Sequence, residues 1–416
     1  MTFARPARRV LIAATSLTAL LAAAACGGSG SSTAPAGSGS SAPAVDMSKH
    51  GPIEYWQGKD TSGNAKNLIA QWNSEHPDEK VTLRELPDNA DQQRQQMIQN
   101  TQIKDTKMGV ISVDIVWTAE FAANGYVVPL PADQFPTDEF LPATVKGSTY
   151  FNKLYAYPTS SDGGLLYYRK DLLDKYDLQP PTTFDEMKTA CKTIKDGEKD
   201  SKLNCFAGQY QKYEGLTVNA AEAINSAGGV IVGDDGTILK GAITWQEEQG
   251  RQAFQDGELI FHRNWPYVYS LAQKTDGSSK VAGKFGVAPL PGVSGPGVSS
   301  LGGHNWAIAA NAENKGTAAD FIKWWASSEI QKDNALATSA APTRSALYTD
   351  PDMVKKYPYM PILLKSIETA QPRPIAVQYG DVTLAIQDAA YGALQGQTAT
   401  DAALSSLQTK LQGLIK

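Results

Sequence analysis

The chain has 416 residues and a formal net charge of −5, with 38 basic against 43 acidic side chains. This length permits two domains. Because the sequence has no run of basic residues, its composition argues against nucleic acid as a partner.

The N-terminus has the pattern of an export signal. Three arginines fall within the first nine residues, and the apolar run that follows, residues 10–25, is too short to span a bilayer well. Small residues then precede Cys26, which resembles the lipobox of bacterial lipoproteins. We predict a signal peptide over residues 1–25 and lipidation of Cys26. Cleavage by an ordinary signal peptidase, without a lipid anchor, is the alternative.

The segment after the signal consists mostly of Gly, Ser, Ala, Pro and Thr. Such a composition cannot bury enough apolar surface to fold. We predict that residues 26–48 are a flexible linker and that globular structure begins at residue 49. No later apolar run reaches the ~18 residues of a membrane-spanning helix, so we expect no second membrane segment.

Short apolar runs then alternate with helical patterns. We expect strands at residues 53–56, 81–86 and 111–117, and a helix that begins at residue 121 and ends near residue 125. Between the first two strands, a helix places Leu68, Ile69 and Trp72 on one face. This βαβ pattern predicts an α/β fold with a mostly parallel sheet covered by helices.

A capping box marks a helix in the second region. Thr183 and Glu186 have the spacing at which the hydroxyl accepts the N3 amide hydrogen bond and the carboxylate reaches back. The apolar positions that follow at helical spacing are Phe184, Met187, Cys191 and Ile194.

Cys191 and Cys205 are the two cysteines that remain after Cys26. They lie in an exported chain, on either side of a polar loop, with no histidine nearby to complete a zinc site. We therefore predict that they form a disulfide.

The stretch HRNWPYVYS, residues 262–270, does not look like ordinary core. Alternating aromatic residues suit one face of a strand, yet Pro266 brings no N–H to a ladder. Because Trp265 and Tyr267 lie two positions apart, we expect them to point the same way in an extended segment. These rings either fill the interior of a domain or face a ligand, and Arg263 is interpreted as a structural anchor.

Two later helices are predicted from apolar spacing. One opens at Thr317 and turns Phe321, Ile322 and Trp325 inward. The last helix carries an apolar stripe of Leu404, Leu407, Leu411 and Leu414. We interpret this stripe as core packing, because it is too short for a coiled coil.

Common catalytic and nucleotide-binding motifs are absent from the sequence, which has no P-loop, GxGxxG, GxSxG, HExxH or CxxC. Its four histidines are too few for a metal cluster or a convincing triad. We therefore expect no cofactor, no metal and no catalytic activity. A metal site that uses Tyr167 and Tyr168 is a minor alternative.

Eight segments together carry a family resemblance. They are GKDTSG at 58–63, ADQQRQQ at 90–96, DIVWTAEF at 114–121, GGLLYYR at 163–169, YEGLT at 213–217, RNWPY at 263–267, LGG at 301–303 and APTR at 341–344. In this order they resemble the family 1 extracellular solute-binding proteins, the sugar-binding lipoproteins of ABC importers, in the trehalose/maltose-binding branch. The resemblance spans nearly all of residues 51–416.

The resemblance implies a two-lobe, periplasmic-binding-protein-like fold of type II, with the ligand cleft between α/β lobes joined by crossing segments. We expect lobe 1 at residues 49–158 and 288–341, and lobe 2 at residues 159–287 and 342–416. The implied function is a monomeric receptor on the extracellular face of the cell membrane. It binds trehalose or a related α-glucoside disaccharide and delivers it to the transmembrane subunits of an ABC permease.

A sugar has apolar C–H faces and a belt of hydroxyl groups, so its site needs flat rings together with carboxylates, amides and guanidiniums. The resemblance and this chemistry select ten candidate ligand-binding residues: Lys59, Asp60, Arg94, Asp114, Asp162, Trp265, Tyr267, Gly303, His304 and Arg373. Several of these residues could instead have a structural role. Asp114 suits a helix N-cap, Asp162 an Asx turn, and Arg94 a solvated helix face. Glu214 is a weaker candidate.

A secreted carbohydrate-active hydrolase is the competing hypothesis. Asp114 and Asp162 would then be the paired carboxylates of a glycosidase. Release of reducing sugar would separate this enzyme from a binding protein.

Overall fold

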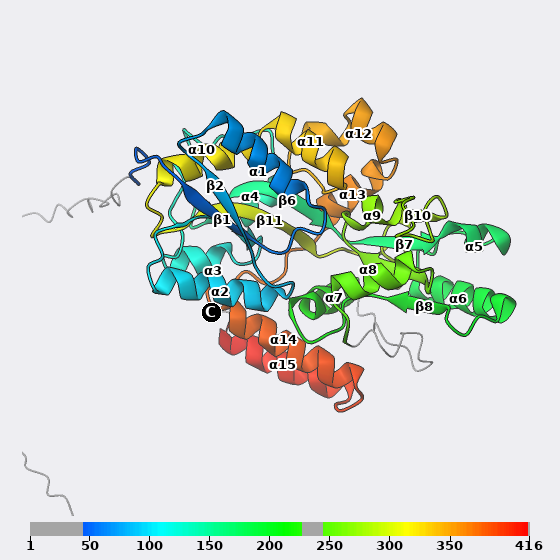
Figure 1. Cartoon of the computed structure of the whole chain (residues 1–416). Helices are drawn as coiled ribbons and strands as arrows, with labels where there is room; N and C mark the ends of the chain where they lie inside the picture. The colour runs from blue at the N-terminus through cyan, green and yellow to red at the C-terminus, as the bar shows by residue number, and fades with distance from the viewer. Residues whose placement is uncertain (1–44, 227–243, 415–416) are drawn as a thin grey trace, which may run out of the picture. The chain divides into compact units, whose positions relative to one another are not determined.

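Two β-sheets organise the part of the chain that a computed structural model describes, residues 45–226 and 244–414 (Figure 1). The predicted signal peptide, Cys26 and most of the predicted linker lie outside the described residues. Within the described ranges, no helix combines the length and the apolar character needed to cross a membrane.

The first sheet has the strand order β2-β1-β3-β11-β6. Its strands are β1 Ile53–Gln57, β2 Val81–Glu85, β3 Met108–Asp114, β6 Tyr157–Gly163 and β11 Leu301–Ile308. β1 pairs parallel with β2 and β3, as the βαβ pattern predicted, whereas β11 runs antiparallel to β3 and β6. Two antiparallel pairings at one side therefore correct the expectation of a mostly parallel sheet.

The second sheet has the order β10-β7-β9-β8. Its strands are β7 Leu165–Arg169, β8 Asn204–Ala207, β9 Leu259–Asn264 and β10 Phe285–Ala288. Of the described strands in this sheet, β8 and β9 pair in parallel, and the other neighbours pair antiparallel. A separate two-stranded ribbon joins β4 Thr149–Tyr150 to β5 Lys153–Leu154.

Helices surround these sheets, which makes the fold mixed α/β as expected. They are α1 Asn64–Glu75, α2 Ala90–Gln102, α3 Thr118–Ala123, α4 Pro142–Gly147, α5 Lys170–Lys175, α6 Phe184–Glu198, α7 Glu214–Asn225, α8 Glu247–Gln255, α9 Val268–Ala272, α10 Lys315–Trp325, α11 Ser328–Thr338, the 3-10 helix η2 Ser345–Tyr348, α12 Pro351–Lys356, α13 Met360–Thr369, α14 Tyr379–Leu394 and α15 Thr400–Leu414.

Local sequence signals explain several of these helices. The predicted face of α1 is buried, and the indole N–H of Trp72 donates to the Glu79 carbonyl at 2.9 Å. At the start of α6, the Glu186 amide donates to Thr183 Oγ1 at 3.1 Å, and the Thr183 amide donates to Glu186 Oε2 at 3.2 Å. The capping box is therefore confirmed.

Two predicted boundaries shift along the chain. The strand expected at residues 111–117 is β3, which ends at Asp114, and α3 begins at Thr118 rather than at residue 121. The Trp117 amide donates to the Asp114 carbonyl at 2.8 Å, so the chain turns directly after the strand. This early turn leaves the Asp114 carboxylate at the end of the sheet.

The expectation of an extended segment through Trp265 and Tyr267 is wrong. β9 ends at Asn264, Pro266 lies in a turn, and Tyr267 precedes the first residue of α9 in a helical backbone conformation. Proline suits this turn because it has no N–H to leave unpaired. The two rings are therefore placed by a turn and not by the alternation of a strand.

The leucine stripe of the last helix is only partly core. Leu404 is 47% exposed, whereas Ala403 and Leu407 are buried against α14. Leu411 and Leu414 pack at the edge of the same small cluster. The buried face of α15 therefore begins at Ala403, one residue before the predicted position.

Among the described residues, two connections between consecutive strands cross from one sheet to the other. One is the single residue Gly164 between β6 and β7, and the other is residues 289–300 between β10 and β11. The predicted lobe limits at 158/159 and 287/288 fall inside β6 and β10, so the sheets place both crossings later in the chain. A bridge between Ser300 and Gln371 brings the C-terminal segment to the second crossing.

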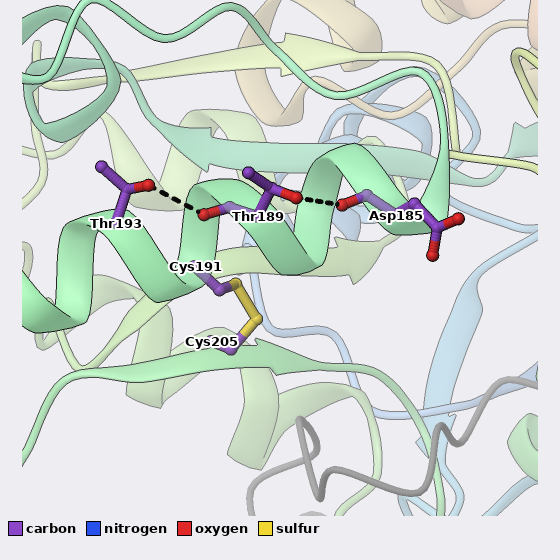
Figure 2. The surroundings of a disulfide bond; sticks show 5 residues. All are labelled: Asp185, Thr189, Cys191, Thr193 and Cys205. Carbon is purple, nitrogen blue, oxygen red and sulfur yellow. Dashed lines mark hydrogen bonds between the residues drawn. A yellow bond between two sulfur atoms is a disulfide. The ribbon is translucent and has the colours of Figure 1, made fainter.

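Cys191 and Cys205 are joined by a disulfide, with 5.3 Å between their Cα atoms (Figure 2). The bond connects the buried face of α6 to β8. Along the helix, the hydroxyls of Thr189 and Thr193 donate to carbonyls one turn back, at 2.9 and 3.0 Å. The disulfide therefore fixes a helix onto the second sheet and closes a loop with a sequence separation of 14.

Replacing both cysteines with alanine is expected to lower the free energy of unfolding by about 3 kcal/mol, because the unfolded chain regains the freedom of this loop. Urea unfolding of the variant and of the oxidised wild type would measure the difference. Wild-type protein unfolded with a reductant should resemble the variant. Equal unfolding midpoints for oxidised and reduced wild type would show that the disulfide contributes nothing.

Candidate functional site

A cavity of about 400 Å³ lies where the ends of both sheets meet, a volume suited to a small-molecule ligand. β1 and β3 reach it from the first sheet, and the turn after β9 reaches it from the second. The predicted site residues that line it are Lys59, Asp60, Asp114, Asp162, Trp265, Tyr267, Gly303, His304 and Arg373. Of the ten candidates, only Arg94 does not line this cavity.

Asp114 and Arg373 form a buried ion pair in the cavity wall. Arg373 Nη2 lies 2.8 Å from Asp114 Oδ1, and Arg373 Nη1 lies 3.3 Å from Asp114 Oδ2. The guanidinium also donates to Glu214 Oε1 at 2.5 Å, and Arg373 is only 2% exposed. Asp114 is therefore already engaged by the protein. One cation holds a carboxylate from the first sheet and one from α7.

Glu214 accepts hydrogen bonds from two hydroxyl groups in addition to the Arg373 guanidinium. The hydroxyl of Tyr379 donates to its Oε1 at 2.5 Å, and that of Thr383 donates to its Oε2 at 2.7 Å. Burial raises the pKa of Glu214 to about 7, although Arg373 opposes this shift. Glu214, the weaker candidate from the sequence, thus belongs to the hydrogen-bonded wall of the cavity. Two residues of α14, Tyr379 and Thr383, are part of the same network.

Asp162 differs from these two carboxylates because its side chain has no hydrogen-bond partner among the described residues. It lies on β6 opposite Gly302 of β11 and lines the cavity. Burial raises its pKa to about 7, the nearby Arg263 opposes this shift, and Asp114 adds to it. Asp162 is therefore a carboxylate at the cavity wall with its acceptor capacity unused.

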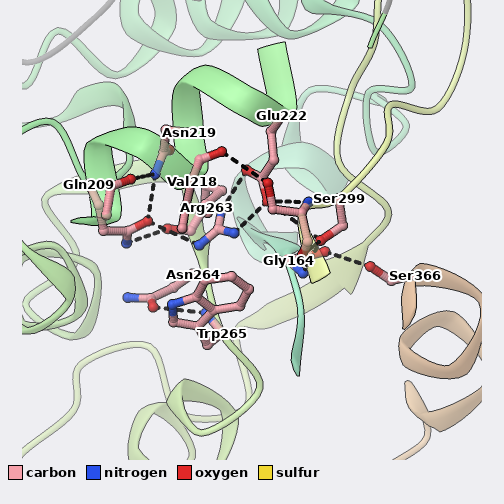
Figure 3. A network of polar contacts seen from close by, with 12 residues as sticks. Gly164, Gln209, Val218, Asn219, Glu222, Arg263, Asn264, Trp265, Ser299 and Ser366 are labelled. Carbon is pink, nitrogen blue, oxygen red and sulfur yellow. Dashed lines mark hydrogen bonds and ion pairs between the residues drawn. The ribbon is translucent and has the colours of Figure 1, made fainter. Parts of the chain in front are cut away.

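Trp265 is partly exposed and lies between the two sheets. The Arg263 guanidinium carbon is 3.8 Å from the centroid of its ring (Figure 3). A Cβ added to Gly302 would lie 2.9 Å from the ring atoms Cη2 and Cζ3 of Trp265 and 3.1 Å from the Asp162 Cβ. The absence of a side chain at Gly302 therefore lets an aromatic ring from the second sheet approach the first sheet.

Tyr267 and Tyr213 are held by the start of α8. The Tyr267 hydroxyl donates to Glu248 Oε1 at 2.7 Å, and the Tyr213 hydroxyl donates to Glu247 Oε2 at 2.6 Å. Both hydroxyls are engaged, so the rings are the parts left to meet a ligand. The sequence reasoning missed Tyr213 and the first turn of α8, since two glutamates at a helix start look like ordinary dipole stabilisation.

Lys59 and Asp60 lie on the loop after β1, as predicted, but they differ in availability. Asp60 accepts hydrogen bonds from the amides of Ser62, Gly63 and Ala65 at 2.9 to 3.0 Å, so it organises the start of α1. Lys59 is exposed and makes no ion pair within the described part of the chain. Lys59 is thus the freer of the two side chains.

Gly303 and His304 lie on β11 beside Asp114. Gly303 has a φ of +108°, and a Cβ there would lie 2.4 Å from the Ser160 carbonyl oxygen, so glycine is required by the backbone itself. His304 pairs with Asp114 in the strand register. Burial lowers the pKa of His304, although the nearby Asp114 carboxylate opposes this shift.

Arg94 lies outside the cavity, on α2. Its Nε donates to Glu120 Oε2 at 2.6 Å, and its Nη2 contacts Glu120 Oε1. Both side chains are largely buried, so this bidentate pair ties α2 to α3. The structure thus gives Arg94 a partner within the protein.

The contacts of Tyr167 and Asp114 bear on the two alternatives raised by the sequence, which are a metal site and a hydrolase. The Tyr167 hydroxyl is buried and donates to the Trp265 carbonyl at 2.9 Å, which makes it a support for the turn after β9. Asp114 is occupied by Arg373, whereas Asp162 is not. One carboxylate of the proposed hydrolase pair is therefore bound to a cation.

The family model described as bacterial extracellular solute-binding protein matches residues 57–332. A probable ABC transporter-binding protein of Deinococcus radiodurans is 33% identical over 361 residues, which are 80% of this chain and 86% of that protein.

Solved structures agree with this match. The maltose-bound MalE3 of T. maritima has a TM-score of 0.81 and 31% identity, and the match covers 87% of this chain and 99% of that one. The GacH receptor of Streptomyces glaucescens, solved unliganded and with acarbose, has a TM-score of 0.75 and 22% identity, with 88% and 98% covered. At this lower identity the GacH receptor supports the two-lobe fold alone.

Proposed function

The chain belongs to the bacterial extracellular solute-binding protein family, and we propose that it is the sugar-binding receptor of an ABC importer. Its ligand in this proposal is trehalose or a related α-glucoside disaccharide such as maltose. The receptor holds the sugar in the cavity between the sheets and delivers it to the permease. Lipidation of Cys26, with the linker to residue 48, would keep it at the outer face of the cell membrane.

The observation that carries this proposal is the pairing of Trp265 with Asp162 at one cavity wall. A partly exposed ring suits the apolar face of a sugar, and a carboxylate without a protein partner suits its hydroxyls. Gly302 brings the two together, since its missing Cβ leaves room for the ring beside the Asp162 Cβ. The maltose-bound MalE3, at 31% identity, supports a disaccharide as the ligand class.

Ligand contact with both sheets would favour a closed arrangement of the lobes by population shift. Asp162 and His304 come from the first sheet, and Trp265 and Tyr267 follow the second. A sugar that touches both sets binds the closed form better than the open form. Small-angle scattering of the unliganded and sugar-bound protein would detect the expected compaction.

A thermal-shift screen over trehalose, maltose, sucrose and polyols, followed by calorimetry, would test the function. We expect at least one α-glucoside to raise the melting temperature by several degrees and to bind with a 1:1 stoichiometry. If none of these sugars binds, the proposed ligand class is wrong. Release of reducing sugar above background would instead favour the hydrolase.

The affinity for the sugar is expected to rise with pH through the range in which Asp162 loses its proton. Burial sets the pKa of Asp162 in the unliganded protein to about 7. Sugar hydroxyls donate to the carboxylate form, so binding lowers this pKa and releases a proton. Affinity should therefore increase by up to about tenfold per pH unit below pH 7 and level off above about pH 8.

Calorimetry between pH 5.5 and 8.5 in buffers of different ionisation heat would measure both the affinity and the released protons. Asp162→Asn is the matched variant, because it keeps the shape and removes the titration. Glu214 also titrates near pH 7 and is retained in that variant. An unchanged pH profile in Asp162→Asn would assign the proton release to Glu214 rather than to Asp162.

A further inference from the structure

The ring of Trp265 rests on a buried guanidinium. Arg263 is 2% exposed, and its central carbon lies 3.8 Å from the ring centroid. Figure 3 shows the indole of Trp265 directly below the guanidinium of Arg263. A cation over an aromatic face attracts the ring electrostatically, and the attraction is stronger where water is excluded. One face of the ring is therefore occupied by the protein, and its orientation follows that of Arg263.

Arg263 is in turn held in one plane by two partners. Its Nε and Nη2 donate to the two carboxylate oxygens of Glu222 at 2.9 and 2.5 Å, and its Nη1 donates to Gln209 Oε1 at 3.1 Å. The Asn219 amide also donates to Gln209 Oε1, at 3.1 Å. Two parallel hydrogen bonds to one carboxylate fix the plane of the guanidinium as well as its position. A lysine at this position would keep the positive charge but would not present a planar group to the Trp265 ring.

Glu222 hydrogen-bonds to one crossing between the sheets and lies close to the other. The Ser300 amide donates to its Oε1 at 3.1 Å, and Ser299 Oγ lies 3.5 Å from the same oxygen. Ser299 Oγ accepts from the Gly164 amide at 2.6 Å. A Cβ on Gly164 would lie 2.8 Å from both Arg263 Nη2 and Glu222 Oε1. The ion pair is thus packed against the chain segments that join the lobes.

We propose that Arg263 is a positioning residue for the ligand: its pair with Glu222, braced against both crossings, holds the Trp265 ring in the orientation that stacks on a sugar. This inference rests on the proposed sugar-binding function. It assigns affinity to a residue that lies behind the cavity wall rather than in it. Arg263 acts through Trp265, so its effect must vanish when the ring is removed.

A double-mutant cycle on the affinity for trehalose and maltose tests this dependence. Arg263→Lys is expected to weaken binding about tenfold in the wild-type background, because the charge stays near Glu222 while the flat support is lost. In the Trp265→Ala background, the same change is expected to alter affinity by less than twofold. Calorimetry gives the affinities, and circular dichroism with thermal melting shows that each variant is folded.

Arg169→Lys is the matched control. Arg169 also lies in the second sheet and forms a bidentate pair, with Asp171 at 2.7 and 2.6 Å, but it does not line the cavity. Its replacement should change affinity by less than twofold. If Arg263→Lys does not fold, Arg263→Met with Glu222→Gln removes both charges and leaves an acceptor for the Ser300 amide. That pair of changes should show the same dependence on Trp265.

Three outcomes distinguish a failure of the positioning role from a failure of the proposed function. If the wild type binds a sugar and Arg263→Lys weakens binding equally with and without the Trp265 ring, the positioning role is overturned and the proposed function stands. The same holds if Arg263→Lys leaves affinity unchanged. If the wild type binds no sugar at all, the proposed function fails, and the positioning role fails with it.

Discussion

Replacing Arg373 with methionine is expected to lower the free energy of unfolding by about 3–5 kcal/mol at pH 8. Arg373 is the cation between Asp114 and Glu214, at 2.8 and 2.5 Å, and it is almost completely buried. Methionine keeps the apolar stem but leaves two carboxylates without a charge partner. Removing one partner of a buried ion pair costs more than the pair itself contributes, because the remaining charge has lost its solvation.

The loss of stability should depend on pH. Burial already raises the pKa of Glu214 to about 7 with Arg373 in place, and removing the cation raises it further. The folded variant then binds more protons than the unfolded chain, so its stability falls as pH rises from about 5 to 8. Urea unfolding at pH 5 and pH 8 should show a smaller deficit at pH 5.

Arg84→Met is the matched control for this experiment. Arg84 pairs with Glu54 at 2.9 Å, but its side chain is 58% exposed, so solvent screens the pair and the expected loss is much smaller. A deficit of the same small size for Arg373→Met at pH 8 would show that solvent or another cation reaches the carboxylates. The buried cluster would then not hold α7 and β3 together.

The sequence predicted best those features of the fold that short-range patterns determine. The face of α1, with Leu68 and Trp72, follows from helical spacing, and the start of α6 follows from the capping box of Thr183 and Glu186. The partners of β11 could not be predicted this way. Its antiparallel pairing with β3 and β6 joins residues far apart in the chain, and no local pattern records that choice.

For the candidate site too, the sequence predicted which residues take part but not which of their side chains are already paired within the protein. Residue chemistry and family resemblance selected Asp162 and Trp265, which the structure brings to one cavity. They could not show that Arg94 is paired with Glu120 or that Asp60 organises the start of α1. Whether a polar side chain is free for a ligand depends on partners that only the tertiary structure supplies. Tyr213 was missed although its segment, YEGLT, belongs to the family resemblance, because a tyrosine before a helix does not by itself indicate that its ring lines a cavity.

Replacing Trp265 with alanine is expected to weaken sugar binding by about 2–3 kcal/mol, or roughly 30- to 150-fold, the scale of a central aromatic contact. The Arg263 guanidinium contacts one face of the ring, and the edge of the ring packs against Gly302. The ring is therefore already held in place, and sugar binding does not have to order it. Trp265→Phe should recover part of the affinity, since a smaller flat face remains. Calorimetry with trehalose and maltose would measure both variants.

Stability and affinity must be separated in this test. Trp265 is partly exposed, so the alanine variant should stay folded, although Arg263 loses its stacking partner. Trp324→Ala is the control. Trp324 is a residue of α10 that packs against Phe321 of the same helix and does not line the cavity. It should lower the melting temperature without changing affinity. Unchanged sugar affinity in a folded Trp265→Ala protein would remove this ring from the binding site and leave Asp162 without its proposed aromatic partner.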